Sequence, residues 1–357
     1  MNFKGLMTKK TRILFTIPNF DTAGSQYVLL AIIDKLDKSH FDVFIGVQKS
    51  QELIPNVVPD DHKMLIDYTG SFLKDIYSLA KVLYRFKIDL VHSWDYKSNF
   101  IEPIACRLAF TPYLYTKKNA AWSKRWFLKS LLSKHIAYNH PKMKSNFFNH
   151  FLLRNKVSFI HHGINLVQFK PIESNHKDEG VFKMCCIGNI GDNKNQLFIL
   201  EQLKVLPEAI HLYLFGNADP VYLIKLKDFI TKEQLHNRVH LREFVENDQL
   251  PELLNGFDLF LLVSRREGLP VSILEALACG VPVLCSESGG GTQYILAEEK
   301  GGVVFNLNQP EKFKESLLKF FNNKEYFHQK KKEATLTARK FDLLKEVKAY
   351  ESLYLQL

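Results

Sequence analysis

The sequence predicts two α/β domains, each a parallel sheet wrapped on both faces by helices. Short β-branched runs alternate with helical patterns along most of the chain, and such alternation is typical of parallel sheets. The alternation comes in two series, separated by a polar stretch at residues 173–180. A chain of 357 residues, 46% of them apolar, can build two cores. We therefore expect domains at 1–170 and 171–337, and a C-terminal helix at about 338–357 that packs back on the first.

Hydrophobic runs place the elements. Strands of the first series are expected at 12–17, 41–48, 64–66 and 90–92, and helices at 25–36 and 72–86. Strands of the second series are expected at 182–187, 211–215, 238–241, 259–263 and 281–285, each followed by a helical segment. In doubly wound folds ligands bind beyond the carboxyl ends of the strands. A cleft facing both domains is therefore the expected site.

Cysteine usage and hydropathy bear on the compartment. The five cysteines are few, odd in number and set in apolar surroundings, without the paired spacing of a zinc ribbon or a secreted disulfide framework. The first residues lack a long apolar run before a cleavage site, and no run of about 18 apolar residues occurs. We expect a cytoplasmic protein with buried thiols.

The positive charge is concentrated in the first half. Residues 1–176 hold 25 Lys and Arg against 13 Asp and Glu, whereas the remainder holds 23 against 25. Between residues 103 and 172 there is no carboxylate. The cations of that stretch include Lys117, Lys118, Lys124, Arg125, Lys129, Lys134, Lys142, Lys144, Arg154 and Lys156. Aromatic and aliphatic residues interleave them. We therefore expect the lysines and rings of segment 117–156 to share one helix face that docks on an anionic membrane; a solvated basic face is the alternative, and nucleic acid is not expected.

The segment 264–291 carries the clearest sign of chemistry. After the apolar run 259–263 come Glu267-Gly268-Leu269-Pro270 and a helix expected from roughly Val271 to Ala278, and Pro270 suits a first helical position. The free N–H groups of a helix start form an anion site. Glu267 in the loop and Glu275 two turns along can accept hydrogen bonds from sugar hydroxyls. The alternative is a first-turn Glu267 that complements the helix dipole and a surface Glu275.

The sequence around these glutamates resembles that of a known family. Glu267-Gly268-Leu269-Pro270, then Glu275-Ala-Leu-Ala-Cys-Gly-Val-Pro-Val283, then Ser288-Gly289-Gly290, resembles the donor-site signature of the retaining glycosyltransferases of family 4, which have the GT-B fold. Other segments fit in order: the loop 18–24, the interdomain segment 160–171, Cys186-Ile187-Gly188-Asn189 with Lys194-Asn195, the strand end at Gly216, and the nucleobase loop 241–245. The resemblance covers most of the chain.

The resemblance implies roles for particular residues. Glu267 is expected to contact the transferred sugar, Glu275 the ribose, and Lys194 the diphosphate, so that Glu267 and Lys194 are the catalytic pair. The further donor-binding residues are Gly24, Gly188, Asn189, Gly216, Phe244, Gly268, Leu269, Pro270 and Val271. Asn189 stands where the family usually has an arginine, a place that Arg265 or Arg266 could fill unless both are exposed loop residues. Lys117-Lys118-Asn119 stand near the place of an acceptor-domain histidine.

The function implied is transfer of a hexose or N-acetylhexosamine, with retention, from a nucleotide-sugar, preferably a UDP-sugar. The acceptor is expected to be a polysaccharide precursor or lipid-linked glycan, used at the inner face of the cell membrane. Neither a metal ion nor a cofactor is expected, because cationic side chains and a helix start can stabilise the leaving diphosphate. The alternatives are a catalytically weak sugar-nucleotide-binding partner in a complex, which Asn189 favours, and phosphorolysis or sucrose-type synthesis.

Overall fold

The computed structural model describes residues 9–20, 24–48, 54–95, 99–119, 121–172 and 180–357. Its contacts divide the chain into two units, Met1–His161 with Leu344–Leu357, and His162–Leu343. The expected boundaries at 170 and 337 differ from these because the segments next to them pair within the second unit. Ile164 bridges to Asp342, and a Cβ added to Gly163 would lie 2.5 Å from the Leu343 Cα. The polar stretch 173–180, apart from Gly180, lies outside the described residues.

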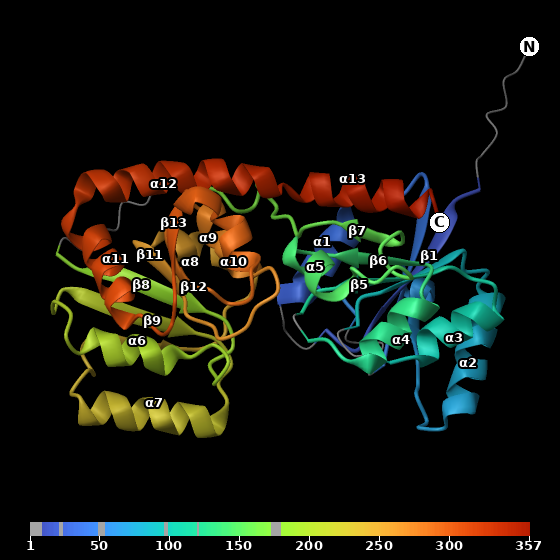
Figure 1. The fold of residues 1–357 in the computed structure, drawn as a ribbon, viewed down its shortest axis with the longest axis horizontal. Coiled ribbons are helices and arrows are strands. Elements are labelled where there is room, and N and C mark those ends of the chain that lie inside the picture. Colours follow the sequence, from blue (N-terminus) through green and yellow to red (C-terminus); the bar gives the residue numbers. More distant parts are fainter. Residues whose placement is uncertain (1–8, 21–23, 49–53, 96–98, 120, 173–179) are drawn as a thin grey trace, which may run out of the picture. The chain divides into compact units, whose positions relative to one another are not determined.

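The first unit is built on a parallel sheet of seven strands (Figure 1). The strands are β1 (Thr11–Ile17), β2 (Phe41–Val47), β3 (Lys63–Leu65), β4 (Leu90–Ser93), β5 (Tyr113–Lys117), β6 (His135–Tyr138) and β7 (Val157–Phe159). Their order is β3-β2-β1-β4-β5-β6-β7, and every described neighbour pair is parallel. The order therefore reverses between β1 and β4, which makes that place the switch point where such sheets bind ligands.

Six helices complete the described part of this unit. They are α1 (Gly24–Lys35), α2 (Phe72–Arg85), α3 (Ile101–Leu108), α4 (Lys124–Leu132), α5 (Lys142–Phe147) and, from the C-terminus, α13 (Leu343–Tyr354). The last helix is bonded to the sheet: the Tyr354 hydroxyl lies 2.8 Å from His92 Nδ1, and the Tyr350 hydroxyl lies 3.0 Å from Thr116 Oγ1. The expected return of the C-terminal helix to the first domain is confirmed.

The second unit contains a parallel sheet of six strands in the order β10-β9-β8-β11-β12-β13. The strands are β8 (Phe182–Ile187), β9 (Ile210–Phe215), β10 (Val239–Arg242), β11 (Leu259–Leu262), β12 (Val283–Ser286) and β13 (Gly302–Phe305). The helices are α6 (Gln196–Leu203), α7 (Pro220–Lys232), α8 (Leu250–Asn255), α9 (Val271–Ala278), α10 (Gly291–Ile295), α11 (Pro310–Asn322) and α12 (Lys324–Ala338). Short 3₁₀ turns lie at Asp60–His62, Ala297–Glu299 and Arg339–Phe341. The expected pair of doubly wound domains is thus confirmed.

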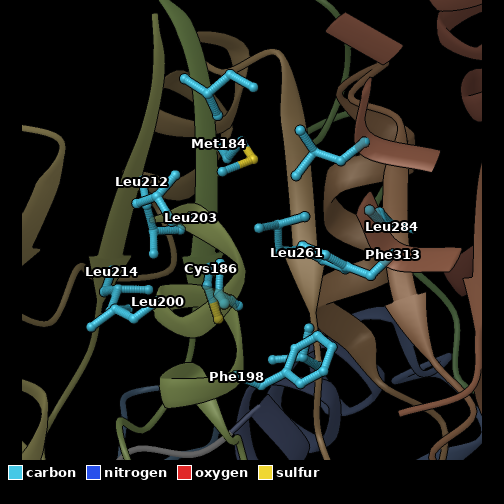
Figure 2. Packing of buried hydrophobic residues seen from close by; sticks show 14 of the residues in the cluster. Met184, Cys186, Phe198, Leu200, Leu203, Leu212, Leu214, Leu261, Leu284 and Phe313 are labelled. Atoms are coloured by element: carbon cyan, nitrogen blue, oxygen red, sulfur yellow. The ribbon is translucent and has the colours of Figure 1, made fainter. Parts of the chain in front are cut away.

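Both faces of the second sheet are buried. Helices α6 and α7 cover one face and α9 and α12 the other (Figure 1). On the α6 face, Leu200 and Leu203 pack against side chains of β8 and β9, and Phe313 of α11 approaches Leu261 of β11 (Figure 2). Strands covered on both sides read as continuous apolar runs, which is why β11 is predicted so clearly. All four of its side chains are buried.

The basic segment 117–156 does not form one cationic helix face. It is divided among the end of β5, α4, β6, α5 and the approach to β7. Lys117 and Lys129 are fully buried, and so are Trp126 and Phe148 of the interleaved aromatic set. The interpretation that all these cations and rings share one surface is therefore wrong. The exposed cations of the segment are Lys124, Arg125, Lys134, Lys142, Lys144 and Arg154.

Candidate active site

The predicted catalytic residues follow two adjacent strands of the second sheet. Lys194 lies in the loop after β8, and Glu267 lies in the loop after β11. These strands are neighbours, with Phe260 paired to Cys185, and the strand order reverses between them. The two loops therefore lie at the switch point of this sheet, where parallel α/β folds bind their ligands.

Lys194 and Glu267 form an ion pair. The Lys194 Nζ donates to Glu267 Oε1 at 2.8 Å, and the two side chains are only 23% and 16% exposed. A partly buried pair of this kind holds both groups in place more firmly than a surface pair does. An ammonium and a carboxylate are thus fixed together at the edge of the sheet.

Hydrogen bonds join the two loops that carry this pair. The Arg265 N–H donates to the Asn193 carbonyl at 2.8 Å, and the Asn193 side-chain amide donates to the Arg266 carbonyl at 3.0 Å. The Arg265 guanidinium donates to Asn195 Oδ1 at 3.1 Å. Asn195 has a φ of 57°, a left-handed conformation that asparagine tolerates better than most residues, and α6 begins directly after it. Arg265 thus links the two loops through hydrogen bonds. Asn189, in the loop after β8, is exposed.

Two glycines allow the strand ends beside Lys194 to touch. Gly188 and Gly216, after β8 and β9, have φ values of +140° and +141°. A Cβ on Gly216 would lie 2.2 Å from the Gly188 carbonyl oxygen, and one on Gly188 would lie 3.5 Å from Lys194 Cε. Only glycine adopts this backbone conformation without strain and allows so close a contact. The backbone at these positions therefore lies close to Lys194.

The loop that contains Glu267 leads directly into α9. Pro270 is the N-cap of this helix, with φ −73° and ψ 111°, so the expectation that it is the first helical residue is wrong by one position. Leu269 is buried and anchors the turn. A Cβ on Gly291 would lie 1.8 Å from the Gly268 carbonyl oxygen, so α10 packs directly against this loop. The Ile273 N–H donates to the Pro270 carbonyl at 3.3 Å, whereas the N–H groups of Val271 and Ser272 come too early in the helix for such a bond and can bind an anion.

Glu275 is a buried carboxyl, not a surface one. Its side chain is 8% exposed and receives a hydrogen bond of 3.4 Å from the Asn247 side-chain amide, which in turn lies beside Gln168. Burial raises the pKa of Glu275 to about 7, against the opposing effect of the Asn247 hydrogen bond. The alternative of a solvated Glu275 is therefore wrong. Asn247 carried no signal in the sequence, because it lies in an irregular polar loop.

Glu275→Gln is expected to stabilise the protein at alkaline pH. The folded pKa is raised above the unfolded value, so the ionised carboxyl costs stability that grows as pH rises from about 4.5 to about 7. Removing the charge should add about 1–3 kcal/mol to the unfolding free energy at pH 8 and almost nothing at pH 4. Urea titrations at the two pH values check this. Equal stabilisation at both would contradict the assignment.

Two further predicted donor-binding residues lie on other elements than this cluster. Phe244 is half-buried in the segment after β10, and no described ring or ion contact links it to Lys194 or Glu267. Gly24 begins α1 in the first unit, and a Cβ added there would meet nothing within 4 Å. By contrast, the Ser288 carbonyl accepts from the Glu267 N–H at 2.6 Å, which brings the glycine-rich turn after β12 into the site.

Several known proteins are similar to this chain in sequence. Residues 168–337 match the family model described as glycosyl transferases group 1. The chain is 24% identical, over 80% of each chain, to a UDP-Gal:alpha-D-GlcNAc-diphosphoundecaprenol alpha-1,3-galactosyltransferase of Escherichia coli. It is 26% identical to an N,N'-diacetylbacillosaminyl-diphospho-undecaprenol alpha-1,3-N-acetylgalactosaminyltransferase of Campylobacter jejuni, over 62% of this chain and 65% of that one.

The solved structures show the same fold. The Anabaena protein HepE, in complex with UDP and glucose, superposes with a TM-score of 0.81 at 16% identity, covering 97% of this chain and 100% of that one. The family match spans the β8–β13 sheet that carries Lys194, Glu267 and Glu275. Residues 168–337 therefore resemble the glycosyl transferases group 1, and the chain is a glycosyltransferase with the GT-B fold.

Proposed function

We propose that this enzyme transfers a hexose or N-acetylhexosamine, with retention of configuration, from a UDP-sugar to a glycan linked to a lipid through diphosphate. The observation that carries the proposal is the Lys194–Glu267 pair at the switch point, beside the start of α9. The names of both curated relatives specify diphospho-undecaprenol acceptors, and that of the E. coli relative a UDP-sugar donor. The Anabaena structure binds UDP and glucose at 16% identity, which supports the fold rather than the specificity.

In this proposal each group of the cluster has one task. Lys194 and the first N–H groups of α9 stabilise the charge that grows on the departing diphosphate, so that the protein itself takes the role that a metal ion or a cofactor could otherwise play. Glu267 accepts hydrogen bonds from hydroxyls of the transferred sugar, and Glu275 accepts them from the ribose. Gly188 and Gly216 let the backbone approach the phosphates. Gly268, Leu269, Pro270 and Val271 form the turn that presents the helix start.

The transfer step forms one bond and breaks one bond at the anomeric carbon. The acceptor hydroxyl oxygen bonds to that carbon on the face from which the diphosphate leaves, and the carbon–oxygen bond to the diphosphate breaks. The hydroxyl proton passes to a departing diphosphate oxygen, and UDP is released. Neither glutamate needs to become a covalent nucleophile, unlike the carboxylate pair of a retaining glycosidase.

We further propose that the exposed part of the basic segment contacts an anionic membrane at the inner face of the cell membrane. On α4, Lys124 and Arg125 lie near the exposed Leu128, and beyond α5 Arg154 follows the exposed Phe151 and Leu152. Cations beside apolar side chains suit the headgroup region. Among the described residues, none of the helices has the length and apolar character to cross a bilayer.

A transfer assay tests the proposed reaction. The purified chain is incubated with UDP-glucose, UDP-galactose, UDP-N-acetylglucosamine or UDP-N-acetylgalactosamine and with a sugar-diphospho-polyprenol in vesicles containing phosphatidylglycerol. We expect one sugar to be added from at least one donor, and proton NMR of the product to show the anomeric configuration of the donor. An inverted product would contradict the retaining mechanism.

Co-sedimentation tests the membrane contact separately. We expect the wild-type chain to pellet with phosphatidylglycerol vesicles at low salt and to be released at high salt, because attraction between exposed charges is screened. Replacing Lys124, Arg125 and Arg154 with glutamine should abolish pelleting. Failure of the wild-type chain to pellet at low salt would overturn the proposal.

A further inference from the structure

Three lysines are buried at the carboxyl end of the first sheet, in the unit that does not carry the donor site. Lys117 is the last residue of β5, Lys118 follows it, and Lys129 lies on α4. Lys117 and Lys129 are fully buried, and Lys118 is partly buried. Lysine is seldom buried because an ammonium loses its hydration there.

Aromatic rings and neutral oxygens surround these ammonium groups. The Lys117 Nζ lies 3.8 Å from the centre of the Trp126 ring and donates to Asn119 Oδ1. The Lys118 Nζ lies 4.4 Å from the centre of the Trp94 ring and donates to the Trp94 carbonyl. Cation–π contacts recover only part of the lost hydration. Among the residues that the structure describes, neither Lys117 nor Lys118 forms an ion pair with a carboxylate.

Two carboxyls lie close enough to these lysines for their charges to act on them. Asp95 and Glu102 are the acidic groups whose charges act on Lys118 and Lys129. Glu102 already accepts hydrogen bonds from the Ser93 hydroxyl at 2.6 Å and the Tyr113 hydroxyl at 2.8 Å. Desolvation, with repulsion from Lys129 as the smaller cause, lowers the pKa of Lys117 to about 7. Among the described residues, Glu102 is therefore hydrogen-bonded to two hydroxyls and not to Lys117 or Lys118.

Polar groups on the next strand end adjoin the lysines. Lys117 pairs in register with Tyr138, so the residues after β6 lie beside those after β5. There the Asn139 side-chain amide lies 3.5 Å from the Lys118 carbonyl. His140 is 1% exposed, and neither of its ring nitrogens has a hydrogen-bond partner in the described part of the chain. A buried imidazole with two unmet nitrogens is a group that a ligand can satisfy.

This cluster lies where a doubly wound sheet binds ligands. β4, whose end carries Trp94 and Asp95, is at the switch point, and β5 is its neighbour. The indole N–H of Trp94 donates to the Ser25 carbonyl at 2.6 Å, which ties the first turn of α1 to the same edge. Apolar residues could fill a purely structural role at this edge without the free-energy cost of burying a charge. Buried cations here therefore suggest a site for an anionic ligand.

We propose that Lys117 and Lys118, with His140, bind the diphosphate of the acceptor, which links its sugar to the lipid. The inference rests on the proposed function, because it takes the diphospho-linked acceptor from there. A diphosphate supplies the counter-charge that the lysines lack and accepts hydrogen bonds from ammonium and imidazole groups. In the proposed function the donor diphosphate binds Lys194 and the start of α9, which belong to the second unit.

Binding of inorganic pyrophosphate tests the site without any transfer. The full chain carrying Lys194→Ala, which weakens the donor site, is titrated with sodium pyrophosphate by calorimetry, with and without Lys117→Met and Lys118→Met. We expect the two methionines to lower the affinity at least tenfold. Methionine fits an apolar aromatic site, so the variant should keep its circular dichroism and its melting temperature. The control variant carries Lys38→Met and Lys81→Met, which replace two exposed lysines, and we expect its affinity for pyrophosphate to be unchanged.

Steady-state kinetics distinguish the acceptor from the donor as the source of the diphosphate. With Lys194 restored, the two methionines should raise the KM for sugar-diphospho-polyprenol about tenfold and leave the Kd for UDP unchanged, and His140→Gln should raise that KM to a smaller extent. Unchanged pyrophosphate affinity together with unchanged acceptor KM would overturn the site. A raised Kd for UDP with an unchanged acceptor KM would assign the cluster to the donor and overturn the proposal. A third outcome is also possible: the wild-type chain transfers no sugar, but the methionine substitutions still abolish pyrophosphate binding. That result would support an anion site at these lysines and would contradict the proposed function.

Discussion

We expect Lys194→Ala to lower kcat by about 10²–10³-fold, equivalent to about 3–4 kcal/mol of transition-state stabilisation. The reason is that its ammonium is held 2.8 Å from Glu267, in a site where both side chains are largely excluded from water. An ammonium in such surroundings stabilises a departing diphosphate far more than one in bulk water does. The measurement is the initial rate of UDP release at saturating donor and acceptor, with the Kd for UDP determined by calorimetry on the same preparation.

Lys227→Ala is the matched control, because Lys227 is exposed on α7 and contributes nothing to the cluster. Its rate should equal that of the wild-type enzyme. Glu267→Ala should lower kcat to a similar extent as Lys194→Ala, and the double variant should lose less than the product of the two effects, because each residue holds the other in position. Unchanged turnover in Lys194→Ala would exclude the lysine from the reaction.

Gly291→Ala has the largest expected effect on folding among substitutions near the site. Its new Cβ would lie 1.8 Å from the Gly268 carbonyl oxygen and 3.1 Å from the Leu269 Cα, so α10 and the loop before α9 must separate. Backbone atoms cannot rotate aside as a side chain does, and we expect the unfolding free energy to fall by about 3 kcal/mol. UDP binding should weaken as well, since the same loop presents the start of α9. Urea titration and UDP calorimetry measure the two effects.

Gly191→Ala serves as the control for Gly291→Ala. The nearest atom to its added Cβ is in the Asp219 side chain at 4.0 Å, which is an ordinary contact, so stability should change by less than about 0.5 kcal/mol. If Gly291→Ala were as stable as Gly191→Ala, the close contact between α10 and the Gly268 loop would not exist in solution.

The elements with continuous apolar runs can be predicted from the sequence, often to within one or two residues. The runs at 182–187 and 259–263 correspond to β8 and β11, because strands buried on both faces contain few polar residues. β5 and β6 are not predicted, since they are short and include Thr116, Lys117 and His135, which resemble a polar loop. Charge counted along the chain cannot tell which cations are buried. This is why the sequence of segment 117–156 suggests a single surface that the fold does not form.

The residues of the candidate site are likewise only partly predictable from the sequence. The motif and its resemblance point to Lys194, Glu267 and Glu275, and the parallel pairing of β8 with β11 explains how the first two meet although 73 positions separate them. The burial of Glu275 cannot be predicted, because it depends on loops that only the folded chain brings over α9. Asn247, which donates to Glu275, is missed for the same reason.

The most direct test of the proposed reaction is transfer of one sugar from a UDP-sugar to a diphospho-linked acceptor, followed by mass spectrometry of the lipid-linked product. We predict a mass increase of one hexose or N-acetylhexosamine with at least one of the four UDP-sugars, and its near-complete loss in Lys194→Ala under the same conditions. Absence of product and of UDP release with all four donors, in a folded protein that also fails to bind UDP, would contradict the assignment of this enzyme as a UDP-sugar transferase.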